Sequence, residues 1–552
     1  MLHFRKRASA GLFKRLRGDE RGAVAVQFAF LALPISILAF GLLDMNRLSV
    51  QRRQLQDALD AATLMAARST ATTNSGLDTV GDAAFAAEMA GLGLTLTTAN
   101  TTFVSGTGNK VIGSASVTVT PIISNLWTNG NSTVTASSEV LRSVNKLEVA
   151  LVLDNTGSMD YDLGSGGKKI DALIDASKDL VDTLYAAAAR ASETDAVKIA
   201  VVPFSMTVNV GSTYSSANWI TGTMPDQAYY GPDVFATSQN RFTMMTQTGT
   251  TWAGCVESRP HPYDITDDAP SPSTPASMFI PFFAPDEPDD NTVKYPSSSS
   301  KYRDSRVRNN GEIYNNWITD DKTSSTDWFT RQGEVAKYAT GNKSKVISQA
   351  KTGTDYGPND GCGIASVLRM TNVRTSAGAT TVKDKLDDMV ATGNTNVAMG
   401  MVWGWHMVSP NAPFADGSAY GTKNVSKVIV LLTDGDNVMS ETGNPNDSTY
   451  SGYGYVWQKR LKNASNVSLD TGASGADRRD AMDSRQTKTC AAAKAKGVII
   501  YSIGVGVSDH SKVVLQGCAS TSDKYYDVTN ADQLTAVFDA IAGSIQNLRI
   551  SK

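Results

Sequence analysis

The sequence predicts an α/β protein with a doubly wound, mostly parallel sheet and large loop insertions, preceded by one transmembrane helix and a small α+β domain. Three observations lead to this prediction. From residue 146 to residue 548, apolar runs of strand length alternate with runs of helical spacing, as in a parallel sheet covered by helices on both faces. An uncharged stretch lies near the amino terminus. A segment whose side chains alternate with period two follows it.

The amino-terminal region has the features of a membrane anchor. Residues 1–22 form a basic segment with seven Lys and Arg residues against two acidic ones, and the 21 residues of 23–43 carry no charge. At about 1.5 Å per residue this run spans roughly 30 Å, enough for one bilayer crossing. It is longer than a signal-peptide core and ends in Asp44, so we expect a retained helix. The basic excess precedes the span, which favours a cytoplasmic amino terminus.

Residues 44–145 are expected to form a helical stalk and a small β-rich domain. Apolar residues between 55 and 66 recur at helical spacing, so the membrane helix should continue outward to about Arg68. The following residues are rich in Thr, Ser and Val, and residues 111–120 alternate as strands do.

Residues 146–548 are expected to form the large α/β domain. Its strands are expected at 147–153, 197–204, 427–433, 497–505 and 525–528, and its helices at about 168–190, 381–390, 397–408, 477–496 and 531–547. Polar insertions at about 206–380 and 438–476 lack sustained periodicity, and they leave the sheet near strand ends. Prolines concentrated between residues 260 and 288 predict an extended, solvated loop in the larger insertion.

Five oxygen-bearing side chains stand where a parallel sheet places its ligands, beyond the carboxyl ends of its strands. They are Asp154, Thr156 and Ser158 after the first strand, Thr395 before a helix, and Asp434 after a later strand. Two carboxylates and three hydroxyls form a set of hard oxygen ligands that suits Mg²⁺, with Mn²⁺ or Ca²⁺ as the alternatives. Such a set leaves an exchangeable position that an acidic side chain of a partner could fill. For any one segment alone, a turn that caps the next helix is the alternative explanation.

The spacing Asp154-x-Thr156-x-Ser158, followed by Thr395 and by Thr-Asp-Gly at 433–435, resembles the metal-ion-dependent adhesion site of von Willebrand factor A domains. That motif usually has Ser where this chain has Thr156, a change that keeps the hydroxyl and adds a methyl group. The resemblance implies a von Willebrand factor A-like fold for the large domain outside its insertions. It also implies metal-dependent binding of a carboxylate on a partner protein.

Cysteine usage predicts two disulfides. The chain has an even number of cysteines and no C-x-x-C pair, which fits an oxidising compartment better than a zinc or redox site. Buried free thiols are the alternative, and four cysteines allow three pairings. We expect Cys490 to pair with Cys518, because they flank one expected strand, and Cys255 with Cys362, because both lie in the larger insertion.

The amino-terminal sequence narrows the family. Residues 21–29, Arg-Gly-Ala-Val-Ala-Val-Gln-Phe-Ala, resemble the opening of the TadE/TadG-like proteins of tight-adherence (Flp) pilus systems, as do residues 254–260 and 403–405. An A-like domain after such an anchor is the arrangement of the TadG-like members. The resemblance implies a single-pass protein of the bacterial inner membrane with its main domain in the periplasm. Gln27 stands where related pilin-like proteins have Glu, so we expect no processing by a prepilin peptidase.

Composition and motifs argue against other classes. A net charge of -3 gives no support for a nucleic-acid partner. None of the histidines, His3, His261, His406 and His510, lies in a hydrolase motif, and the chain has no G-x-S-x-G or P-loop. We therefore expect a non-enzymatic, metal-dependent protein-binding component that assembles or anchors a Flp-type pilus. A stand-alone surface adhesin using the same metal site is one alternative, and a metal-assisted hydrolase is the other.

Overall fold

The computed structural model divides the chain into two compact units, Met1–Ser143 and Val144–Lys552. It describes residues 20–69, 71, 73–91, 99–106, 110–119, 132–141, 146–162, 167–189, 191, 193–224, 230–288, 315–318 and 328–550. Most of the expected basic segment, residues 1–19, and the expected domain junction at residue 145 lie outside these ranges. Each unit has its own buried apolar clusters.

One long helix, α2 (Glu20–Arg68), runs through the expected membrane span and the expected stalk. Its apolar segment is long enough and apolar enough to cross a membrane. Large apolar side chains along this segment are exposed, Phe28 at 72% and Phe30 at 78%. Farther along, Leu55 and Leu59 belong to a stripe that is buried against the rest of the first unit.

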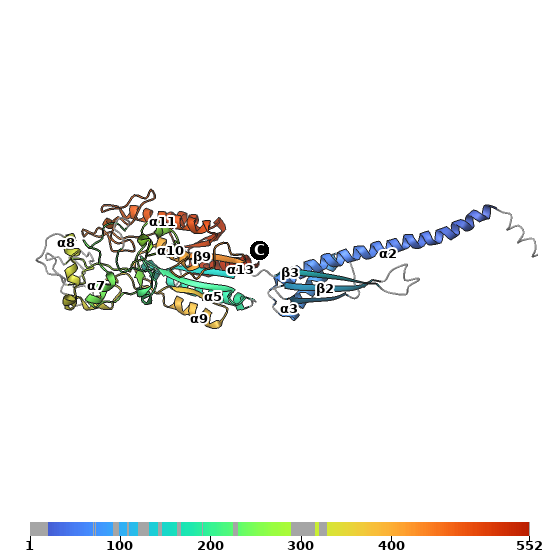
Figure 1. Cartoon of the computed structure of the whole chain (residues 1–552), viewed down its shortest axis with the longest axis horizontal. Coiled ribbons are helices and arrows are strands. Elements are labelled where there is room, and N and C mark those ends of the chain that lie inside the picture. The colour runs from blue at the N-terminus through green and yellow to red at the C-terminus, as the bar shows by residue number, and fades with distance from the viewer. Residues whose placement is uncertain are drawn as a thin grey trace, which may run out of the picture. The chain divides into compact units, whose positions relative to one another are not determined.

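That unit is completed by a second helix and a three-stranded antiparallel sheet (Figure 1). The helix α3 (Asn74–Gly91) is a difference from the sequence prediction, which expected strands alone after the stalk. The strands are β1 (Ala99–Gly106), β2 (Lys110–Val119) and β3 (Ser132–Leu141), in the order β1-β2-β3. A Cβ atom on Gly113 of β2 would lie 2.1 Å from Oγ1 of Thr63, so glycine at this position permits the close approach of α2.

The second unit is built on a six-stranded mixed sheet with the order β11-β10-β9-β4-β5-β8. The strands are β4 (Lys146–Asp154), β5 (Val197–Phe204), β8 (Leu368–Asn372), β9 (Val425–Thr433), β10 (Ile499–Val505) and β11 (Tyr525–Val528). Five neighbouring strands are parallel, and β8, which the sequence did not predict, pairs antiparallel with β5 at the edge.

Apolar clusters cover both faces of this sheet because alternate residues of a strand point to opposite sides. The helices are α5 (Lys169–Ala189), α9 (Ser376–Asp387), α10 (Val397–Val408), α11 (Gly475–Ala495), α12 (Asp509–Cys518) and α13 (Ala531–Ile550). Leu151 and Leu153 of β4 pack with α5, α9 and α13, whereas Val152 packs with α10 and with residues of the insertions. Figure 1 shows α5 and α9 on one side of β9 and α11 on the other.

The two insertions form a packed body. The larger one contributes β6 (Val208–Asn209), β7 (Cys255–Val256), α7 (Arg241–Thr248) and α8 (Trp328–Gln332). Its proline-rich stretch is solvated only in part, because residues 268–275 are exposed or partly exposed whereas residues 276–288, with Phe282 and Phe283, are buried. Aromatic residues between the prolines, Phe279, Phe282 and Phe283, pack in the interior with residues of the insertions and of α10, which a composition rule cannot detect.

Candidate metal centre

The carboxyl ends of β4 and β9 place two acidic side chains at one edge of the sheet. The strands are parallel neighbours, with Leu153 opposite Leu432, so the residues that follow leave the sheet together. Asp154 ends β4 and is fully buried, and Asp434 follows β9 and is 5% exposed.

The hydroxyls of the first motif join the second carboxylate. The side-chain oxygens of Thr156 and Ser158 lie 3.1 Å apart, and Ser158 donates to Oδ1 of Asp434 at 2.6 Å. A 3₁₀ turn, Gly157–Asp160, follows Thr156 and contains Ser158. The first amide of the turn donates to the carbonyl of Gly393 at 3.0 Å, which ties the turn to the segment before α10.

Thr395, in the segment that precedes α10, also lies near Ser158 and Asp434. Its carbonyl accepts a hydrogen bond from the amide of Val438 at 2.8 Å. A Cβ atom built on Gly435 would lie 3.9 Å from the side-chain oxygens of both Ser158 and Thr395. The two hydroxyls therefore face the turn after β9. The structure thus brings all five expected residues together from three separated segments.

The electrostatics of the centre are set by buried negative charge. Burial first, and the charge of Asp434 second, raise the pKa of Asp154 to about 6. Hydrogen bonds act in the opposite direction: the Thr156 amide donates to Oδ1 at 2.8 Å and the Thr433 hydroxyl to Oδ2 at 2.6 Å. Among the described residues, the donors to Asp154 are all neutral, so a cation beside it would relieve both the desolvation and the repulsion.

Two residues near the centre were not predicted from the sequence. Lys169, in the first turn of α5, places Nζ 2.7 Å from Oδ2 of Asp434. Ser205, directly after β5, has a buried hydroxyl with no hydrogen-bond partner in the described part of the chain. It lies close to the same loop, since a Cβ atom on Gly393 would be 3.3 Å from its Oγ. The sequence offered a signal for Ser205, because it is the first residue after the parallel strand β5, next to β4 in the sheet.

The donor set fits a divalent cation. Every expected ligand offers hard oxygen, as Mg²⁺, Mn²⁺ and Ca²⁺ require. The carboxylates are buried, three hydroxyls lie with them, and the Ser205 hydroxyl beside Gly393 has no hydrogen-bond partner among the described residues. The residues to hold an ion are therefore present without rearrangement of the strands.

A second acidic group lies between α11 and α12. Single ligand atoms of Asp480, Asp483 and His510 lie within 4.8 Å of one another. Its members already pair internally, with His510 Nε2 2.6 Å from Oδ2 of Asp483. The amide of Asn437 donates to the other oxygen of Asp483 at 2.7 Å. Both oxygens of Asp483 therefore already have partners within the protein.

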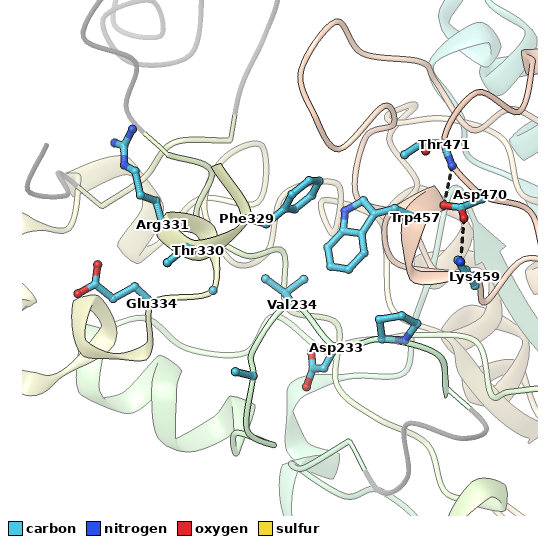
Figure 2. A pocket seen from close by; sticks show the side chains of 13 residues that line it. Asp233, Val234, Phe329, Thr330, Arg331, Glu334, Trp457, Lys459, Asp470 and Thr471 are labelled. Atoms are coloured by element: carbon cyan, nitrogen blue, oxygen red, sulfur yellow. Dashed lines mark hydrogen bonds and ion pairs between the residues drawn. The ribbon is translucent and has the colours of Figure 1, made fainter. Parts of the chain in front are cut away.

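An open pocket of about 970 Å³ lies in the insertions, away from the metal-site residues. Figure 2 shows the rings of Phe329 and Trp457 next to each other in its lining, with Asp233 and Val234 beneath. The two rings are 5.2 Å apart in an edge-to-face arrangement. None of the five expected ligands lines this pocket, so it is separate from the candidate metal centre.

Both expected disulfides are formed. Cys255 pairs with Cys362 across 107 residues, and Cys490 pairs with Cys518 across 28 residues. The first lies inside the larger insertion, and the second joins α11 to α12.

Comparison with known protein families gives a match for the amino-terminal segment. Residues 22–69 match the family described as "Putative Flp pilus-assembly TadE/G-like", which confirms the resemblance at those residues. A search of curated proteins found no match.

Three similar solved structures are pilus proteins. The pilus adhesin SpaC from Lactobacillus rhamnosus GG is 12% identical with a TM-score of 0.33, over 82% of this chain and 34% of that one. The PilB minor pilin from Streptococcus sanguinis is 12% identical with a TM-score of 0.31, over 82% and 78%. The vWF domain of the type V pili tip protein Mfa5 from Porphyromonas gingivalis is 11% identical with a TM-score of 0.30, over 74% and 97%. The chain spans about a third of SpaC, and TM-scores near 0.3 carry no argument about function.

Proposed function

We propose that this protein is a membrane-anchored, metal-dependent binding component of Flp-type pilus assembly or anchoring. Its second unit is proposed to be a von Willebrand factor A-like domain. Asp154, Thr156, Ser158, Thr395 and Asp434 hold the ion, Mg²⁺ or alternatively Mn²⁺ or Ca²⁺. One observation carries the metal proposal: oxygen side chains from three separated segments converge at the ends of two parallel strands, around a carboxylate for which the described residues provide no cationic partner.

The ion supplies positive charge at an exchangeable coordination position, where a partner carboxylate can bind. Around that position the chain provides buried carboxylates and hydroxyls in fixed places. The Ser158 hydroxyl donates to Asp434, so in the 3.1 Å contact between Thr156 and Ser158 the Thr156 hydroxyl is the donor. One lone pair of Ser158 remains available to a cation. Because a partner carboxylate would add negative charge beside the ion, ion and partner are expected to bind as one unit.

The match of residues 22–69 supports a pilus-associated role. In this proposal the apolar part of α2 anchors the chain in the bacterial inner membrane, and residues after Asp44 lie outside the cytoplasm. The two disulfides fit that placement, since disulfides persist in oxidising compartments. Protease added to spheroplasts should digest the second unit, and full protection of it would reverse the orientation.

The role is tested in a deletion strain complemented with variants of the whole chain. Wild-type protein and Asp160→Ala should restore surface pili, whereas Asp154→Ala should not. Asp160 is the matched control, because it lies in the same turn but is exposed and pairs with Lys168. Normal piliation in the deletion strain, with adhesion lost, would favour a stand-alone adhesin. Full rescue by Asp154→Ala would remove the metal from the mechanism.

A further inference from the structure

Lys169 is a cation built into the candidate metal centre. Its Nζ lies 2.7 Å from Oδ2 of Asp434, while Oδ1 of the same carboxylate accepts the Ser158 hydroxyl. The Asp434 side chain is 0% exposed and the Lys169 side chain 14%, so solvent screens this pair little. Both oxygens of Asp434 are therefore engaged in the structure, one with a hydroxyl and one with an ammonium group.

The position of Lys169 is unfavourable for the helix that carries it. It is the first residue of α5, and the positive end of the helix dipole lies there, where cations destabilise. Its backbone amide donates to the carbonyl of Tyr161 at 3.0 Å, which holds the start of α5 against the turn that carries Ser158. The contact with Asp434 thus compensates for a cost that a neutral residue would not incur.

The neighbouring Lys168 shows what the same side chain does one residue away. Its side chain is 50% exposed, and its Nζ lies 2.6 Å from Oδ1 of Asp160, whose side chain is 57% exposed. An exposed pair of this kind contributes little to stability. The two lysines therefore differ in one respect that matters here, contact with a buried carboxylate of the centre.

We propose that Lys169 is a resident cation that neutralises Asp434 in the metal-free protein and competes with the divalent ion for this carboxylate. This inference rests on the proposed function. It means that Lys169 limits the affinity of the site for the divalent ion. With Lys169 in place, the two carboxylates and one ammonium leave one net negative charge for the ion. The metal-free protein is stable, and the ion is held weakly until a partner carboxylate adds its charge.

The test compares Lys169→Gln with Lys168→Gln in the whole chain, purified in detergent. The glutamine amide can still donate to Asp434 but has no charge. Calorimetric titration with Mn²⁺ should show affinity at least about tenfold higher for Lys169→Gln, because a unit positive charge near the ion is removed. Lys168→Gln should match the wild type. In chelator, thermal unfolding of Lys169→Gln should occur at a lower temperature than that of the wild type, and saturating Mn²⁺ should remove the difference.

The outcomes separate this inference from the proposed function. Binding of Mn²⁺ by the wild type with equal or weaker affinity in Lys169→Gln would overturn the competition and leave the metal centre intact. Absence of Mn²⁺ binding in all variants would overturn both. The side-chain oxygen of the new glutamine could itself coordinate Mn²⁺, and the affinity for Mn²⁺ would then rise without any loss of competition. Lys169→Met, which offers no oxygen, must therefore show the same increase, and a failure to do so would also overturn the inference.

Discussion

The insertions and the strand-end centre both bury carboxylates, but they compensate the charge differently. Inside the insertions, Glu257 is fully buried and contacts the guanidinium groups of Arg241 and Arg460. The Tyr450 hydroxyl donates to the same carboxylate at 2.6 Å. At the strand ends, Asp154 is equally buried, yet only an amide and hydroxyls donate to it.

The difference shows which buried carboxylate has positively charged partners within the protein and which one could still accept a cation. Arg460 and Tyr450 belong to the smaller insertion, so this network joins the two insertions and compensates the negative charge of Glu257. A buried charge without a counter-ion is destabilising. Asp154 is such a charge, and the oxygen-bearing side chains around it suit a metal ion. The Glu257 network therefore acts as a support between the insertions, and in our proposal the strand ends act as the binding site.

The largest expected effect concerns the covalent part of that support. Replacing Cys255 and Cys362 by Ala should lower the free energy of unfolding by about 5 kcal/mol, because the disulfide closes a long loop. The matched change at Cys490 and Cys518, which close a 28-residue separation, should cost about 3.5 kcal/mol. Urea unfolding of the oxidised proteins measures both. Equal losses, or four alkylatable thiols in native protein, would contradict this expectation.

Removing each buried carboxylate in turn tests the comparison itself. Glu257→Gln leaves two buried guanidinium groups without their counter-ion and should cost about 3–5 kcal/mol. Asp154→Asn, in chelator at pH 7, should cost nothing or stabilise the protein, because it removes an uncompensated charge. Thermal and urea unfolding give the two values. A loss of several kcal/mol in Asp154→Asn without metal would show that its charge is already compensated.

A third buried carboxylate, Glu287, extends the comparison to the pH dependence of stability. Burial raises the pKa of Glu287 to about 7 from its ordinary 4.5, and its recorded donors are neutral, including the Tyr455 hydroxyl at 3.0 Å. Between these values the folded protein binds more protons than the unfolded chain, so stability from this group is present below pH 4.5 and is lost as the pH rises through 7. Glu287→Gln should remove a fall on the order of 3 kcal/mol between pH 5 and pH 8. The same slope in both proteins would refute this.

The smallest effect is expected at the residue that departs from the usual motif. Thr156→Ser keeps the oxygen and removes a methyl group from a side chain that is 1% exposed. Affinity for the ion should change little, and stability should fall by about 1 kcal/mol. Titration with Mg²⁺ and thermal unfolding measure the two effects. Loss of ion binding in this variant would mean that the methyl group positions the hydroxyl.

Much of this architecture could be predicted from the sequence, for physical reasons. Strands such as Val425–Thr433 contain a continuous apolar run, here residues 428–432, because both of their faces are buried there, and the polar residues that follow mark the expected ligand edge. The edge strand Leu368–Asn372 was missed because it is only half buried and carries mixed side chains. The burial of Phe282 depends on partners far along the chain. So does the contact of Lys169 with Asp434, 265 residues apart, which no local pattern encodes.

The most direct test of the metal centre is calorimetric titration of Mg²⁺ into the whole chain, with four proteins compared. The wild type and Asp160→Ala should each bind one ion per chain with the same affinity. Asp154→Ala and Asp434→Ala should bind none, because each loses one of two anionic ligands, and their circular dichroism should show an intact fold. Unchanged affinity in both Asp154→Ala and Asp434→Ala would contradict the account and place any metal site elsewhere.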